Sequence, residues 1–345
     1  MQTPDISPLD QEPQYPLGVW PTPLQLLPNL TAELGGPRIW VKRDDNSGLA
    51  GGGNKTRKLE FLLGRALAEG YDSIITFGAV QSNHARQTAA ACAKAGIRCH
   101  LILTRQVTRS HPAYESGGNV LLDRLLGADV HLLEADDREG IRALIEEIRT
   151  TCNPYIVPAG GSNATGALGY VRAAVELHQQ CQEHEISLSS IVHASSSAGT
   201  QAGLLCGFTA LNADVDVLGI NVYHQDPDKL IERVHTLVSD VRDEYPYLAT
   251  SAPLPVRVNH AYIADGYGQP DDQTVRALET AACLEGLLLD PVYSGKGFAA
   301  LVDQVAIGNF QHADDVIFIH TGGAPAINVY EDIFQEGSHS LRPAP

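Results

Sequence analysis

Residues 47–60 read SGLAGGGNKTRKLE, and this stretch decides between two kinds of α/β protein. A nucleotide-binding P-loop has the pattern G-x-x-x-x-G-K-[ST]. The glycines have the required spacing, but Asn54 stands before the Lys55–Thr56 pair and misplaces the lysine. A lysine at the start of a helix is disfavoured as a cation, so we expect a lowered pKa for Lys55, which suits Schiff-base chemistry. The alternative is a flexible turn with a solvated lysine.

The rest of the chain alternates short apolar runs with amphipathic segments, which is typical of parallel sheets with helices on both faces. The runs predict strands at 38–42, 72–78, 98–103, 129–133, 154–157, 189–192, 214–223 and 314–319. The amphipathic segments predict helices at 55–70, 83–95, 118–128, 138–152 and 166–181. Stretch 223–262 shows no clear pattern. Ligands of such folds bind at the carboxyl ends of strands, so the turns there are the first candidate sites.

Composition excludes several classes of function. The 345 residues carry a formal net charge of −17, which argues against sequence-independent nucleic-acid binding. The six cysteines form no C-x-x-C pair, and we expect reduced thiols of a cytoplasmic protein. The acidic N-terminus lacks the features of a signal peptide, and no apolar run is long enough to span a bilayer. The histidines show no metal-ligand spacing, and no G-x-S-x-G motif indicates a serine hydrolase, so we expect no catalytic metal and no hydrolase triad.

Three of these turns carry polar or small residues. In GAVQSNHARQTAA (78–90), a helix N-terminus with four polar side chains suits a carboxylate or phosphate, although Ser82 or Asn83 is also expected to cap the helix. In HASSSAGTQAG (193–203), hydroxyls and backbone amides form a cup for a phosphate, and a plain flexible loop is the alternative. In IHTGGAPA (319–326), Thr321 brings a hydroxyl to the same crevice.

Two tyrosines lie in loops rich in glycine and proline, where functional side chains tend to be displayed. Tyr267 lies in DGYGQPDD and Tyr293 in DPVYSGKG. A tyrosine can stack on a flat cofactor ring and still offer its hydroxyl for proton transfer. Each would be a weak candidate alone, but together with a Schiff-base lysine and a phosphate cup they suggest pyridoxal 5'-phosphate (PLP).

Eight motifs in order extend this suggestion over nearly the whole chain. They resemble the D-cysteine desulfhydrase/1-aminocyclopropane-1-carboxylate (ACC) deaminase family, whose members are PLP enzymes of fold type II, similar to tryptophan synthase β. The motifs are KRDD, GGNKTRKLEF, GAVQSNHARQTAA, GGSNATGALGY, SAGTQAG, GYGQP, LLDPVYSGKG and HTGG.

The resemblance implies a role for each matching residue. Lys55 would bind the cofactor covalently and then move the α-proton, while Tyr293 faces the ring with Tyr267 nearby. Asn83 would bind the ring hydroxyl, and Thr321 the ring nitrogen. The phosphate would be held by Ser197, Ala198, Gly199 and Thr200. The substrate carboxylate would be received by Ser82, together with Gln81, Asn83 and His84.

The resemblance also implies a reaction. We expect α,β-elimination from a small sulfur-bearing amino acid, with D-cysteine giving pyruvate, sulfide and ammonia. L-cysteate sulfo-lyase and ACC deaminase are the alternatives, but Ser294, His84 and Thr321 depart from the deaminase pattern VYEGK, SNQ and HLGG. A nucleotide-binding regulatory protein that uses the 48–55 loop is a further alternative, from another class.

The resemblance implies two α/β domains. Residues 56–165 would form the small domain, and residues 1–55 with 166–345 the large PLP-binding domain. The cofactor would lie in the cleft between them, and a homodimer is expected.

Overall fold

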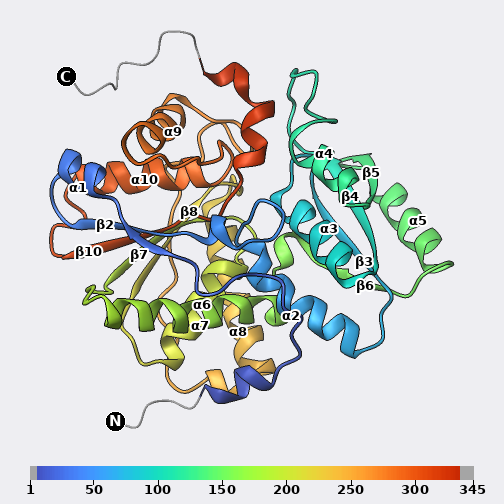
Figure 1. The fold of residues 1–345 in the computed structure, drawn as a ribbon, viewed down its shortest axis with the longest axis horizontal. Helices are drawn as coiled ribbons and strands as arrows, with labels where there is room; N and C mark the ends of the chain where they lie inside the picture. The colour runs from blue at the N-terminus through green and yellow to red at the C-terminus, as the bar shows by residue number, and fades with distance from the viewer. Residues whose placement is uncertain (1–5, 335–345) are drawn as a thin grey trace.

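Two β-sheets covered by helices form the framework of the computed structural model, which describes residues 6–334 (Figure 1). The six-stranded sheet has the order β1-β2-β10-β7-β8-β9, and only β1 runs antiparallel to its neighbour. Its strands are β1 (Leu24–Leu26), β2 (Arg38–Lys42), β10 (Asp315–Ile319), β7 (Ser190–Ser195), β8 (Asp216–Asn221) and β9 (Arg257–Asn259).

The second sheet is four-stranded and entirely parallel, in the order β5-β4-β3-β6. Its strands are contiguous in the chain: β3 (Ser73–Ala79), β4 (Arg98–Arg105), β5 (Asp129–Glu134) and β6 (Pro154–Val157). Because successive strand residues point to opposite faces, Ile74 and Ile75 enter two different apolar cores.

Helices cover both faces of each sheet (Figure 1). One face of the large sheet packs against α1 (Pro28–Leu34), α9 (Asp272–Glu285) and α10 (Ser294–Ala306). Its other face packs against α6 (Ala164–Glu183), α7 (Gly199–Ala210) and α8 (Pro227–Glu244). The small sheet lies between α5 (Arg138–Arg149) on one face and α3 (Asn83–Ala95) with α4 (Gly118–Leu125) on the other. Helix α2 (Lys55–Ala68) contacts both α6 and α3 and so joins the two layers.

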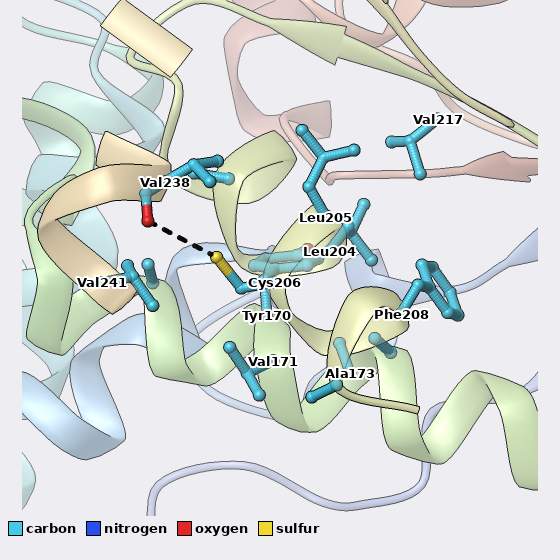
Figure 2. Packing of buried hydrophobic residues seen from close by; sticks show 14 of the residues in the cluster. Tyr170, Val171, Ala173, Leu204, Leu205, Cys206, Phe208, Val217, Val238 and Val241 are labelled. Atoms are coloured by element: carbon cyan, nitrogen blue, oxygen red, sulfur yellow. Dashed lines mark hydrogen bonds between the residues drawn. The ribbon is translucent and has the colours of Figure 1, made fainter. Parts of the chain in front are cut away.

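Helix α7 is buried on all sides, because every residue from Gly199 to Ala210 is inaccessible to solvent. Figure 2 shows its side chains between those of α6 and α8, with the Cys206 thiol facing the carbonyl of Val238 at 4.0 Å. A Cβ atom at Gly203 would lie 2.4 Å from the carbonyl oxygen of Ala167, so only glycine permits this close approach of α6 and α7.

The α/β fold class expected from the sequence is confirmed, and several elements match their predicted bounds. The strand at 38–42 and the helix at 83–95 are reproduced residue for residue as β2 and α3. The stretch at 223–262, which had no clear pattern, contains α8 and β9. Within residues 6–334, no helix is both long and apolar enough to cross a membrane. All six cysteines are free thiols, and four of them are buried.

Candidate active site

A cavity of about 190 Å³ lies where the carboxyl ends of the strands of both sheets meet. The segments that line it follow β3, β6, β7 and β10, at residues 82–84, 159–160, 196–200 and 321. The sequence placed its candidate turns at strand ends, and the structure brings them to one cavity. Of the twelve side chains singled out as site residues, all except Gln81 and Gly199 line it directly.

Lys55 is the first residue of α2, and its amine projects into this cavity. The Nζ atom donates a hydrogen bond to Asn54 Oδ1 at 2.7 Å and lies 5.9 Å from the centre of the Tyr293 ring. Asn54 in turn donates from Nδ2 to Thr200 Oγ1 at 3.1 Å. The residue that breaks the P-loop pattern therefore links the lysine to the first turn of α7.

The pKa of Lys55 is lowered to about 8, as the sequence analysis expected. Burial is the largest cause, because it disfavours the charged amine; the negative charge of Asp290 opposes it, and the positive charge of Arg86 adds to it. Burial, and not the helix terminus expected from the sequence, is therefore the main cause of the shift. A lysine with this pKa supplies a neutral, nucleophilic amine close to neutral pH.

The loop after β7 forms a cup at the N-terminus of α7. Ala198 has a left-handed backbone with φ of 71°, and this turn directs the loop into the helix that begins at Gly199. A Cβ atom at Gly199 would lie 2.5 Å from Ser162 Oγ and 2.8 Å from Lys58 Nζ. The cup therefore requires glycine at this position. Amides of the first helical turn have no partners within the helix, so the cup can bind an anion.

Lys58 is a residue of this cup that the sequence analysis did not select. Its side chain is fully buried, and Nζ donates to the carbonyl of Gly160 at 3.1 Å and to Ser162 Oγ at 3.2 Å. Burial, followed by the charges of Lys55 and Arg233, lowers its pKa well below the ordinary value. An anion bound in the cup would supply the missing counter-charge. The sequence did indicate this position, because Lys58 follows Lys55 by three residues and residues at that spacing share one face of a helix.

The turn after β3 presents Ser82, Asn83 and His84 to the cavity. Ser82 caps α3, as expected, because its Oγ accepts a hydrogen bond from the amide of Ala85 at 3.1 Å. Its hydroxyl proton remains free for another acceptor. Asn83 Oδ1 accepts from Asn119 Nδ2 at 3.0 Å, which fixes the orientation of its side chain.

His84 donates one hydrogen bond through Nε2 and keeps Nδ1 as an acceptor without a partner. Thr76 Oγ1 donates its proton to the carbonyl of Val157 at 2.9 Å, so its contact of 2.8 Å with His84 Nε2 requires Nε2–H as the donor. The other ring nitrogen, Nδ1, is buried without a partner. Burial, with the charges of Lys55 and Lys58, holds the pKa of His84 well below its ordinary value, so the ring is neutral. A neutral Nδ1 acceptor does not suit the carboxylate-binding role that the resemblance implied.

Gln81 is directed away from the cavity. Its Nε2 donates to the carbonyls of Tyr114 and Gly117 at 2.5 and 3.1 Å, and its Oε1 accepts from the amide of Asn119 at 2.9 Å. The amide group is thus directed at the turn before α4 and at the start of that helix. Its expected contact with a substrate carboxylate does not follow from this geometry, which instead holds α4 against the turn after β3.

Tyr267 and Tyr293 meet at the cavity wall and are hydrogen-bonded through their hydroxyls. Their rings pack edge to face with centroids 5.7 Å apart. Burial raises the pKa of Tyr293 and Tyr267, so both remain protonated at neutral pH. The backbone of Tyr293 is fixed by Asp290, whose Oδ2 accepts the Tyr293 amide proton at 2.9 Å.

A buried ion network holds the base of α2 behind the cavity. Arg57 donates to both carboxylate oxygens of Asp44 at 2.8 and 2.9 Å and to Glu176 Oε2 at 3.0 Å. Asp44 also accepts from the hydroxyl of Tyr170 at 2.5 Å. Burial alone would raise the pKa of Asp44, but Arg57, together with Lys42 and the Tyr170 hydroxyl, outweighs burial and lowers that pKa below its ordinary value. Because Arg57 lies two residues from Lys55, the network fixes the position of the reactive amine.

These residues fit PLP. The group needs an amine for its aldehyde, an anion site for its phosphate and partners for its ring, and the cavity offers Lys55, the cup at Gly199 and the side chains of Asn83 and Thr321. One observation favours a bound anionic ligand: Lys58 Nζ is buried, and its partners are a carbonyl and a hydroxyl, with no carboxylate among them. Within the described part of the chain, no group of three or more His, Cys, Asp or Glu residues could hold a metal ion.

Comparisons with known proteins agree with this fit. The family model described as "Pyridoxal-phosphate dependent enzyme" matches residues 15–322. A protein named D-cysteine desulfhydrase from Salmonella choleraesuis (strain SC-B67) is 43% identical over 313 residues, which cover 90% of this chain and 94% of that protein. A protein of the same name from Klebsiella pneumoniae (strain 342) is 44% identical over the same shares.

Solved structures give the same picture. A crystal structure described as an ACC deaminase homologue aligns with a TM-score of 0.85 at 36% identity, covering 96% of this chain and 98% of that one. Serine racemase from Dictyostelium discoideum aligns with a TM-score of 0.61 at 17% identity over 88% of this chain and 92% of that one, a likeness of fold alone.

Proposed function

The chain belongs to the family of pyridoxal-phosphate dependent enzymes, and from this premise we propose that it is a carbon–sulfur lyase acting on a small sulfur-bearing amino acid. D-cysteine is the first candidate, and its products would be pyruvate, sulfide and ammonia. The observation that carries the proposal is the half-buried Lys55 amine, with a pKa of about 8, held by Asn54 beside the cup after β7. The relatives that cover almost the whole chain share the name D-cysteine desulfhydrase.

PLP, when bound, supplies an electron sink that stabilises negative charge at the α-carbon of an amino acid. We assign its covalent attachment to Lys55, whose amine then moves the α-proton. Asn83 and Thr321 would bind the ring hydroxyl and the ring nitrogen. Thr321 is neutral, so it leaves that nitrogen largely unprotonated, which suits elimination of a good leaving group.

The phosphate of the cofactor would occupy the cup formed by residues 197–200. We add Lys58 and Ser162 to this cup, because their hydrogen bond of 3.2 Å lies directly beneath Gly199. Arg233 donates from Nε to the carbonyl of Ser197 at 3.2 Å and supports the cup from the solvent side. These cations would offset the charge of the phosphate in a protein with net charge −17.

The substrate carboxylate would bind the free hydroxyl proton of Ser82 and the first amides of α3. His84 Nδ1 can accept a hydrogen bond from a donor group of the substrate, such as its ammonium or thiol. Tyr293 and Tyr267 remain protonated and can donate to groups above the ring. The site thus offers donors for a carboxylate and an acceptor for a different group.

Ser294 argues against a ring-opening deaminase. The hydroxyl donates its one proton to Asp290 Oδ1 at 2.6 Å and accepts from the amide of Asp290 at 2.8 Å, and the side chain does not line the cavity. The resemblance places a glutamate that interacts with the cofactor at this position in ACC deaminases. L-cysteate sulfo-lyase activity remains the second candidate, because the sulfonate group of L-cysteate would leave as sulfite in the same kind of α,β-elimination.

The test is a keto-acid assay over D-cysteine, L-cysteine, L-cysteate, β-chloro-D-alanine and ACC, with sulfide and sulfite measured alongside. We expect pyruvate and sulfide from D-cysteine, and neither in the Lys55→Ala variant. Lys229→Ala, which changes an exposed lysine of α8, is the matched control and should keep full activity. Pyruvate formation by Lys55→Ala at the wild-type rate would refute the assignment, while sulfite from L-cysteate alone would replace the first candidate by the second.

We also propose the expected arrangement of domains, with residues 56–165 as the small domain, and a homodimer in the cytoplasm. All strands of the four-stranded sheet lie between residues 73 and 157, and the free thiols suit a reducing compartment. Light scattering of the purified protein measures the number of subunits.

A further inference from the structure

The entrance of the cavity is crossed by two exposed polar side chains. Gln106 follows β4 of the four-stranded sheet, and Tyr223 follows β8 of the six-stranded sheet. Both line the cavity, and the Tyr223 hydroxyl donates to Gln106 Oε1 at 3.3 Å. Tyr223 is 39% exposed, so this contact lies at the boundary between the cavity and solvent. The hydrogen bond therefore joins the two sheets across the opening.

The backbones that carry these side chains are anchored. The amide of Tyr223 donates to Asn221 Oδ1 at 3.1 Å, and Asn221 is fully buried. Gln106 donates from its amide to the Thr104 carbonyl at 2.9 Å and from Nε2 to Thr104 Oγ1 at 2.8 Å. Opening the contact therefore needs only side-chain rotation, which takes place within nanoseconds for exposed residues.

The inner side of Tyr223 contacts Tyr267, one of the two tyrosines at the cavity wall. Its ring packs edge to face against Tyr267 with centroids 4.9 Å apart, and Tyr267 is hydrogen-bonded to Tyr293. Beside this contact, Val107 packs against Gly268, the residue that follows Tyr267. The two are so close that a Cβ atom added at Gly268 would lie 2.6 Å from a methyl carbon of Val107. The segment after β4 thus meets the Tyr267 loop as well as Tyr223.

We propose that Gln106 and Tyr223 form a gate that closes the cavity through one hydrogen bond and limits the size of the amino acid that enters. The statement that the gate limits the size of an amino acid rests on the proposed function, whereas the test of the gate itself requires only that the cofactor is bound. A neutral, exposed hydrogen bond shifts an equilibrium by about two- to tenfold, so the gate opens readily. Closure behind a small substrate excludes water from the reacting groups.

The gate is tested on the PLP-loaded enzyme with two reagents that differ in size. Hydroxylamine and O-benzylhydroxylamine both displace Lys55 from the cofactor and change its absorbance, which gives the rate for each. The variants are Gln106→Ala, Tyr223→Phe and Tyr223→Ala; Tyr223→Phe keeps the ring and removes only the hydrogen bond. Gln182→Ala, at an exposed position of α6, is the matched control.

We expect the hydroxylamine rate to change less than about twofold in every variant. The O-benzylhydroxylamine rate should rise about two- to tenfold in Gln106→Ala and Tyr223→Phe, as expected for loss of one hydrogen bond, and further in Tyr223→Ala. The control should match the wild type. Equal melting temperatures would show that the variants remain folded.

An unchanged ratio of the two rates in all three variants would overturn the gate. So would a ratio that rises in Tyr223→Ala alone, because the ring would then act without the hydrogen bond. Failure of the proposed function is visible separately: if D-cysteine gives no sulfide while the ratio rises as expected, the gate stands and the substrate assignment falls.

Discussion

The lowered pKa of Lys55 predicts how fast the cofactor-free protein captures an aldehyde at each pH. Only the neutral amine reacts, and with a pKa of about 8 roughly a tenth of Lys55 is neutral at pH 7. A lysine with the ordinary pKa of 10.5 would be neutral in only about one molecule in three thousand. The site should therefore hold about 300 times more neutral amine than a surface lysine at this pH.

Asn54 is the hydrogen-bond partner through which this prediction can be tested, because its Oδ1 accepts a hydrogen bond of 2.7 Å from the amine and such a bond favours the charged form. A hydrogen bond to a charged group contributes about 1.5–3 kcal/mol, and one pKa unit corresponds to about 1.4 kcal/mol. The neutral amine retains part of the bond, so Asn54→Ala should lower the pKa of Lys55 by about one unit. Asn54→Asp places a carboxylate at the same distance and should raise it.

The assay is capture of pyridoxal, which lacks the phosphate and so does not depend on the cup, followed by absorbance from pH 6 to 10. In the wild type the capture rate should rise about tenfold per pH unit and level off near pH 8. The pH at which the capture rate levels off should be lower in Asn54→Ala and higher in Asn54→Asp than in the wild type. Lys55→Ala measures the background rate from all other amines. A capture rate that levels off only near pH 10.5 in the wild type, or that shifts in the same direction in both variants, would refute the reasoning.

Three further predictions concern the surroundings of this lysine. Asp44→Asn leaves Arg57 partly unpaired in a buried site and should lower the free energy of unfolding by about 3–5 kcal/mol in urea titrations. The pKa values of Asp44 and Glu176 are lowered in the folded protein, so these carboxylates stabilise the fold fully at any pH above their unfolded-state pKa values near 4. This stabilisation is lost as the pH falls, and the free energy of unfolding should therefore drop below about pH 4. The drop should be less steep in Asp44→Asn. Gly199→Ala places a Cβ 2.8 Å from Lys58 Nζ and should weaken PLP binding at least tenfold while pyridoxal capture stays near the wild-type rate; equal losses for both would contradict an anion cup here.

Much of the site was predictable because it follows from where strands end. Ser82, Thr200 and Thr321 each lie in a turn after an apolar run, and parallel strands bring their carboxyl ends to one edge. Lys55 was predictable from its glycine-rich approach and its place at a helix start. Local patterns of this kind need no knowledge of which elements meet in space.

Contacts between distant segments were not predictable. The role of Lys58 depends on Gly160 and Ser162, about a hundred residues further along the chain. Gln81 was assigned to the substrate because it stands in a polar turn, but its amide is satisfied by the start of α4. The tautomer of His84 depends on Thr76 and Val157 in two neighbouring strands, and no pattern in the turn itself specifies it.

The contiguity of the four-stranded sheet has a consequence for recombination between relatives. Strands β3 to β6 occupy one uninterrupted segment, which carries Ser82, His84 and Gln106, while Lys55, the cup after β7 and both tyrosines lie outside it. Groups assigned here to substrate recognition are thus encoded largely apart from those assigned to cofactor capture. Exchanging this one segment with that of a relative is therefore a route to altered substrate preference that keeps Lys55 and the cup and carries only one of the assigned cofactor contacts, Asn83, with it.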